Sequence, residues 1–252
     1  MPGIAMLRHG IFVFPNVEED EECLDIYHIP PIEPGLLGSI RLVGRLNLPK
    51  PASGGNYSVI QCCAAPNPIK DGSFPTYVPS SIPFIDSPEN ALILFKIMVD
   101  SDDSFVEFTM VVHRRALLDL LPPDSELGHE PYFEAAWEEW GPDRTHWFEV
   151  GDGAHCKTNV NGQRYVFSDA TNTCGSPNVT LLDFNPFNVK RATKVQHKSV
   201  LRNPVFDYPL ECRLPYTTVL SKEKHSYDGV MINDSAIIAK VYTFTLHLCC
   251  KR

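Results

Sequence analysis

Residues 91–112 read ALILFKIMVDSDDSFVEFTMVV, and this stretch decides the fold. Its tetrapeptide Leu92-Ile93-Leu94-Phe95 is continuously apolar, which is typical of a central strand buried on both faces. Farther along, residues 106–110 alternate between apolar and polar, as a strand with one buried face does. The short acidic side chains between the two runs can bond their own backbone, which favours a turn. We therefore predict a β-hairpin over 91–112.

Strand-like runs continue on both sides of this hairpin. They are rich in Val, Ile, Phe and Tyr and are separated by prolines and glycines, and they lie at 36–48, 57–64, 164–167, 179–184 and 241–246. A second hairpin is predicted where 228–232 meets 235–239. The leucine-rich stretch 113–121 stops at Pro122-Pro123, which predicts one short helix.

These patterns predict a mainly β fold class, with a propeller-like or open antiparallel β-sheet architecture and one or two short helices. Hairpins that recur every few tens of residues suit propeller blades of about 40 to 45 residues. We expect one β-rich interaction domain over 1–252. The Pro-rich stretch 66–88 is expected to be a long surface connection and is a candidate domain boundary, and 241–252 is an atypical tail.

Charge and hydropathy limit the partners. The formal net charge is -9, so the surface repels phosphate backbones unless cations cluster, and we expect no nucleic-acid partner. One cluster of cations is interpreted as a solvated loop face that could also touch a phosphate or an acidic partner: Lys190, Arg191, Lys194, His197, Lys198 and Arg202. No apolar run approaches the roughly 20 residues that span a bilayer, and 11–14 is too short for an export signal, so we expect no membrane contact and an intracellular location, cytoplasmic or nuclear.

Eight cysteines leave one alternative open. They form no Cys-x-x-Cys pair and lie at 23, 62, 63, 156, 174, 212, 249 and 250. In an intracellular chain they are expected to be reduced and buried. A secreted, disulfide-bearing β domain is the alternative, and it would use glycosylation-type sequons at Asn56, Asn178 and Asn233.

Motifs of catalysis are not apparent. The sequence has no Gly-x-Ser-x-Gly elbow, no phosphate-binding Gly-rich loop and no zinc-ligand spacing, so we expect no enzyme, no cofactor and no metal. Cys62-Cys63 lies in an apolar run without a cationic neighbour in sequence to activate a thiolate. An enzyme of unrecognised type, with a site in a propeller channel lined by Asp183 and His155, stays open as an alternative.

All three tryptophans fall within residues 137–148, which read WEEWGPDRTHWF. Clustered aromatic side chains beside Arg144 resemble the anchors of protein interfaces. Alternatively, Gly141-Pro142 forms a turn and the tryptophans pack inward, with Arg144 on a ring or paired to Asp143. The two interpretations can hold together.

This segment, together with 160–166 (VNGQRYV), 181–186 (LLDFNP) and 227–232 (YDGVMI), resembles the F-box proteins of mushroom-forming fungi. In that family a Trp-x-x-Trp-Gly-Pro-x-x-Thr-x-Trp-Phe stretch precedes a His-Gly-x-Arg strand, a Leu-Asp-Phe-Asn strand and a closing Tyr-Asp-Gly-x-Met-Ile. The similarity covers about 36–239. Residues 1–25 show no counterpart of the F-box, Asn161 replaces the family's His, and the tail 241–252 does not resemble the family's ending.

The resemblance implies a client-recognition domain like the substrate-receptor part of an F-box ubiquitin-ligase subunit, without a recognisable F-box. Its partner would be an unknown protein client, and contact with the ligase adaptor subunit is in doubt without the F-box. Residues that a turn beside paired strands can present to a client are the candidate contacts: Trp140, Asp143, Arg144, Trp147 and Arg164.

Overall fold

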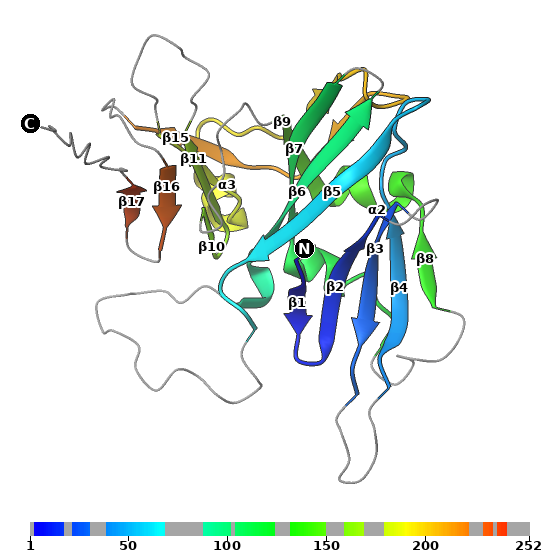
Figure 1. The fold of residues 1–252 in the computed structure, drawn as a ribbon. Coiled ribbons are helices and arrows are strands. Elements are labelled where there is room, and N and C mark those ends of the chain that lie inside the picture. Colours follow the sequence, from blue (N-terminus) through cyan, green and yellow to red (C-terminus); the bar gives the residue numbers. More distant parts are fainter. Residues whose placement is uncertain are drawn as a thin grey trace, which may run out of the picture.

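The computed structural model describes residues 3–17, 22–30, 39–68, 88–101, 104–123, 132–149, 159–168, 179–221, 229–233 and 236–240. Within these residues the chain is mainly β, and most of its strands pair antiparallel (Figure 1). The expected fold class is confirmed at this level. The strand predicted at 241–246 and the tail 241–252 lie outside the described residues.

The hairpin predicted at 91–112 is confirmed, and it forms the centre of a four-stranded sheet. Its strands pair in register from Leu92 with His113 to Ser101 with Ser104. Alternate residues of its first strand face two different hydrophobic cores, so that strand is buried on both faces, as its apolar run indicates. The order of this middle sheet is β5-β6-β7-β9, with bounds β5 (Asn56–Ala64), β6 (Leu92–Ser101), β7 (Ser104–His113) and β9 (Thr145–Glu149).

A five-stranded sheet packs against one face of the middle sheet. Its order is β1-β2-β3-β4-β8, with bounds β1 (Ala5–Arg8), β2 (Ile11–Asn16), β3 (Cys23–His28), β4 (Arg41–Asn47) and β8 (Phe133–Ala135). Of these strands, the sequence predicted only β4. It missed β2 because the apolar run 11–14 ends at Pro15, and proline is usually excluded from strands. Pro15 nevertheless lies inside β2, opposite Leu24.

A second four-stranded sheet packs against the other face of the middle sheet through Tyr165, Leu182 and Phe184. Its order is β10-β11-β12-β15, with bounds β10 (Val160–Asn161), β11 (Arg164–Ser168), β12 (Val179–Asp183) and β15 (Thr217–Leu220). Two hairpins complete the fold, β13 (Ser199–Leu201) with β14 (Leu210–Cys212), and β16 (Gly229–Ile232) with β17 (Ile237–Lys240). The last pair confirms the second predicted hairpin.

The three larger sheets are therefore stacked face to face in chain order, with the β5-β6-β7-β9 sheet in the middle (Figure 1). Each contains four antiparallel strands, which is also the composition of a propeller blade. The described sheets do not close into a ring. Several antiparallel sheets are thus shown, and a propeller-like form stays a prediction.

The described residues contain three α-helices, whereas one or two were expected. They are α1 (Arg114–Leu118), α2 (Trp137–Arg144) and α3 (Pro186–Arg191). The first confirms the helix predicted at 113–121. The second corrects the expectation of a turn at Gly141-Pro142, because the helix continues through both residues.

The Pro-rich stretch 66–88 connects two paired strands of one sheet, because Ala64 at the end of β5 lies opposite Ile93 near the start of β6. The buried Arg114 holds the two ends together: its guanidinium donates to the carbonyl of Pro66 at 2.9 Å and to that of Pro88. Residues 69–87 between them lie outside the described residues.

Candidate interaction surface

The tryptophan motif forms α2, and its rings are directed inward. Trp137, Trp140 and Trp147 are each no more than 3% exposed. The ring of Trp137 meets those of Trp140 and Trp147 edge-on, with centroids 5.3 and 5.7 Å away. Trp140 Nε1 also donates to the carbonyl of Asn47, at 2.9 Å, which fixes α2 to the end of β4. The inward packing of the tryptophans is confirmed, whereas the turn that the same interpretation placed at Gly141-Pro142 is not.

The polar residues of the motif terminate this helix. The Thr145 hydroxyl donates to the carbonyl of Gly141 at 2.8 Å, and the backbone N–H of Arg213 donates to the carbonyl of Pro142 at 2.8 Å. The Gly141 carbonyl also accepts the backbone N–H of Thr145, whereas the bond from Arg213 satisfies a carbonyl that the helix end leaves without a partner. Of the last three residues of α2, Asp143 is exposed and Arg144 is half-buried.

A chain of ion pairs covers this end of α2. One Arg213 nitrogen lies 2.7 Å from the Asp143 carboxylate and the other lies 2.6 Å from Glu211, whose second oxygen is 3.0 Å from Lys198 Nζ. The contacts with Lys198 and Arg213 lower the pKa of Glu211. All four side chains are exposed, so they contribute little to stability, and their charges remain available to a partner.

The structure thus divides the five predicted contact residues into three groups. Trp140 and Trp147 belong to the core and offer no surface. Asp143 pairs with Arg213 and not with Arg144, which has no ion-pair partner among the described residues. Arg164 lies on β11, away from α2 in Figure 1, where it pairs with Asp183 at 3.6 Å. The structure therefore brings together only Asp143 and Arg144, and it adds Arg213, Glu211 and Lys198.

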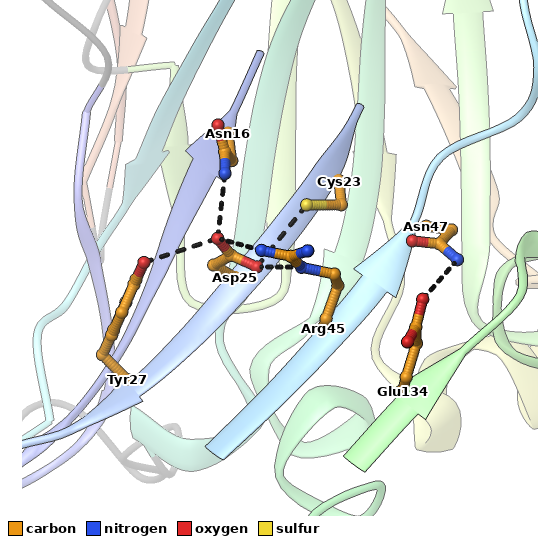
Figure 2. A network of polar contacts seen from close by, with 7 residues as sticks. All are labelled: Asn16, Cys23, Asp25, Tyr27, Arg45, Asn47 and Glu134. Carbon is orange, nitrogen blue, oxygen red and sulfur yellow. Dashed lines mark hydrogen bonds and ion pairs between the residues drawn. The ribbon is translucent and has the colours of Figure 1, made fainter. Parts of the chain in front are cut away.

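A second polar site, which the sequence did not reveal, lies on the five-stranded sheet (Figure 2). The carboxylate of Asp25 is 1% exposed and accepts bonds from Arg45 at 2.8 Å, from Asn16 at 3.1 Å and from Tyr27 at 3.4 Å, and the Cys23 thiol lies 3.5 Å away. Burial, followed by the charge of Asp25, raises the pKa of Tyr27. Because protein groups occupy both carboxylate oxygens, the network fixes strand register and leaves the carboxylate no free capacity for a ligand.

A histidine relay joins β9 to the β13-β14 hairpin. His146 Nδ1 lies 3.2 Å from the Leu214 carbonyl, so this nitrogen carries the proton, and Nε2 accepts a bond from the Ser199 hydroxyl at 3.0 Å. This arrangement resembles part of a nucleophilic triad. However, burial lowers the pKa of His146 to about 4, which makes it a weak base at neutral pH. The relay is better explained as the pair of hydrogen bonds that a buried imidazole needs for its two ring nitrogens.

The remaining catalytic candidates are already engaged or lie outside the described residues. Asp183 accepts bonds from the Asn185 backbone at 2.9 Å and from the Asn188 side chain at 2.8 Å, so it supports the start of α3, whose N-cap is Asn185. His155 lies outside the described residues. Burial raises the pKa of Cys62 to about 12 and also raises that of Cys63. Lys96 does lie near Cys63, but its effect on the pKa is smaller than that of burial.

In the part of the chain that the structure describes, Cys23, Cys62, Cys63 and Cys212 are reduced thiols. Within the same residues no group of His, Cys, Asp and Glu could hold a metal, and no helix is long and apolar enough to cross a membrane. The other four cysteines lie outside that part of the chain.

Comparison with protein-family models, with curated proteins and with solved structures gave no significant match. The resemblance to F-box proteins therefore stays a prediction.

Proposed function

We propose that this chain is a protein-interaction domain that recognises a client through the surface at the end of α2. The observation that carries the proposal is the contrast within the tryptophan motif. Its aromatic residues anchor α2 in the core, and the end of the same helix carries the exposed Asp143, which is paired with Arg213, and the half-buried Arg144. A rigid support under exposed charged groups is what specific recognition requires.

The resemblance supports the same proposal. The family pattern Trp-x-x-Trp-Gly-Pro-x-x-Thr leaves two positions open between Pro and Thr, and here they are Asp143 and Arg144. The fixed positions are those that pack or end the helix. In this proposal the fold supplies a constant scaffold, and the open positions determine the client.

The test is an affinity pull-down of the tagged chain from native extract, analysed by mass spectrometry for cullin, adaptor and other recurrent proteins. The double variant Asp143→Ala/Arg144→Ala is the comparison, and Arg41→Ala, an exposed arginine on β4, is the matched control. We expect the double variant to lose a partner that wild type and control retain. Equal capture by all three folded proteins would refute the proposed surface.

Recovery of cullin and adaptor would show that ligase docking occurs without a recognisable F-box. Their absence, together with a reproducible other partner, would favour a stand-alone binding domain.

A further inference from the structure

A segment of opposite charge to the rest of the molecule adjoins the α2 surface. Between Asp183 and Asp207 the sequence has no acidic residue and five lysines or arginines, although the whole chain carries -9. We name residues 190–202 the basic strap. It runs from α3 to β13, and its cations are Lys190, Arg191, Lys194, Lys198 and Arg202.

Almost all of this charge faces solvent without an acidic partner. Each of the five cations is exposed, and of them only Lys198 forms an ion pair within the described residues, with Glu211. The strap is also held in place: Gln196 pairs with Tyr216 through two backbone bonds of 2.9 and 3.1 Å, and Val189 on α3 is buried. The cations are therefore presented by an ordered backbone.

An exposed aromatic ring accompanies them. Phe187 is 77% exposed, the highest fraction among the large hydrophobic side chains of the described residues. It lies on α3, three and four positions before Lys190 and Arg191, so the ring and these two cations share one helix face. An apolar ring beside cations suits a partner that combines acidic groups with an apolar side chain.

We propose that the basic strap binds an extended acidic peptide segment of the client, with an apolar residue of that segment packed on Phe187. This inference rests on the proposed function and specifies the chemistry of the partner. The strap is continuous with the α2 surface, because Lys198 is joined to Arg213 and Asp143 through Glu211.

The charge distribution favours an acidic peptide over a nucleic acid. Surface charges act over about 8 Å at physiological salt, so a short acidic segment confined to the strap experiences mainly the strap. A long polyanion would extend beyond it onto a surface that is acidic overall.

The experiment measures binding of a fluorescent peptide of about twelve residues, rich in Glu and Asp and containing Leu, by anisotropy with the full chain. Its matched probe replaces every Glu and Asp by Gln and Asn. The test variant is K190E/R191E/K194E. The control variant is R41E/K50E/R115E, which changes the net charge equally at exposed cations outside the strap.

We expect the acidic peptide to bind and the neutral peptide not to bind. The strap variant should bind at least about tenfold more weakly, because each surface charge contributes up to about 1 kcal/mol. The affinity of the control variant should stay within about twofold of wild type. Phe187→Ala should also weaken binding relative to wild type, without altering its salt dependence. Circular dichroism verifies that each variant is folded.

Three results would overturn the inference: equal binding of the two peptides, an unchanged affinity in the strap variant, or tighter binding of an oligothymidylate or of phosphatidylserine vesicles than of the acidic peptide. If any of these occurred while Asp143→Ala/Arg144→Ala still abolished client capture, the proposed function would stand and only the strap's partner would be wrong.

Discussion

The indole ring of Trp137 lies directly over Gly141, one turn farther along α2, so closely that a methyl group at position 141 would overlap the ring. This close approach explains why a glycine follows the second tryptophan in the Trp-x-x-Trp-Gly sequence. Glycine at this position lets Trp137 lie along its own helix and meet Trp140 and Trp147 edge-on.

We expect Gly141→Ala to destabilise the fold by about 2 kcal/mol, because overpacking outweighs the better helix propensity of alanine. Gly44→Ala is the matched control, since a Cβ there would meet its neighbours only at ordinary contact distances of 3.4 Å or more. Urea denaturation measures both. Equal stability of the two variants would contradict the steric explanation.

The Asp25–Arg45 pair is expected to show strong coupling in a double-mutant cycle. Removing one partner leaves a charge in a site where Asp25 is 1% exposed, so Asp25→Asn and Arg45→Met should each cost about 3 kcal/mol. The double variant should cost less than the sum of the two. Additive losses in urea denaturation would mean that the pair does not act as a unit.

Glu134→Gln is the control for this cycle. Glu134 accepts a bond from Asn47 at 3.2 Å on the exposed part of the same sheet (Figure 2). Its substitution should leave the unfolding midpoint nearly unchanged.

Two adjacent arginines on α1 are expected to differ sharply. Arg114 is buried and holds the carbonyls of Pro66 and Pro88, so Arg114→Met should cost about 3 kcal/mol. Arg114→Lys should not restore stability, because one ammonium cannot reproduce the guanidinium fork.

Arg115 provides the comparison. Its side chain is 55% exposed and pairs with Asp119 and Glu89 at the surface, so Arg115→Ala should leave the unfolding midpoint nearly unchanged. Thermal denaturation of the three variants measures this difference. A similar loss for Arg114→Met and Arg115→Ala would contradict the role of Arg114 as a clamp.

Stability should fall as the pH drops from about 7 to about 4.5, partly through His146. Because its pKa is about 4 in the folded state and ordinarily 6.5, the unfolded chain binds more protons between these values. The contribution of neutral His146 is therefore complete above about pH 6.5 and is lost as the pH falls toward 4.

We expect His146→Gln to reduce this pH-dependent loss by about 2 kcal/mol. Urea denaturation of wild type and variant at both pH values measures the difference. Other groups that titrate, such as His113, affect both proteins alike. The same loss in both proteins would exclude His146 as its source.

The sequence by itself determined the class of fold and its central hairpin. The continuous apolar run 92–95 predicts a strand covered on both faces, because only burial on both sides favours an apolar residue at every position. The composition of 137–148 left two interpretations open, and only the structure showed that Trp140 and Trp147 are core residues and not contacts. The hairpin could be predicted because its pattern lies in residues that are adjacent in the sequence.

The tertiary structure decided the rest. A helix through Gly141-Pro142 contradicts local propensity, and it forms because Trp137 needs a glycine beneath its ring and Arg213 donates to the carbonyl of Pro142. The strand β2 likewise includes a proline, at Pro15, because Ile11 and Val13 bury their side chains in the core.

The candidate surface depended most on tertiary structure. Asp143 lies only three residues from the buried Trp140, and its partner Arg213 is 70 residues away in the chain. Which charges meet across such a separation depends on strand register and sheet stacking, and these follow from packing the whole core. The sequence could therefore name the motif, but only the fold separates its exposed residues from those that hold the core together.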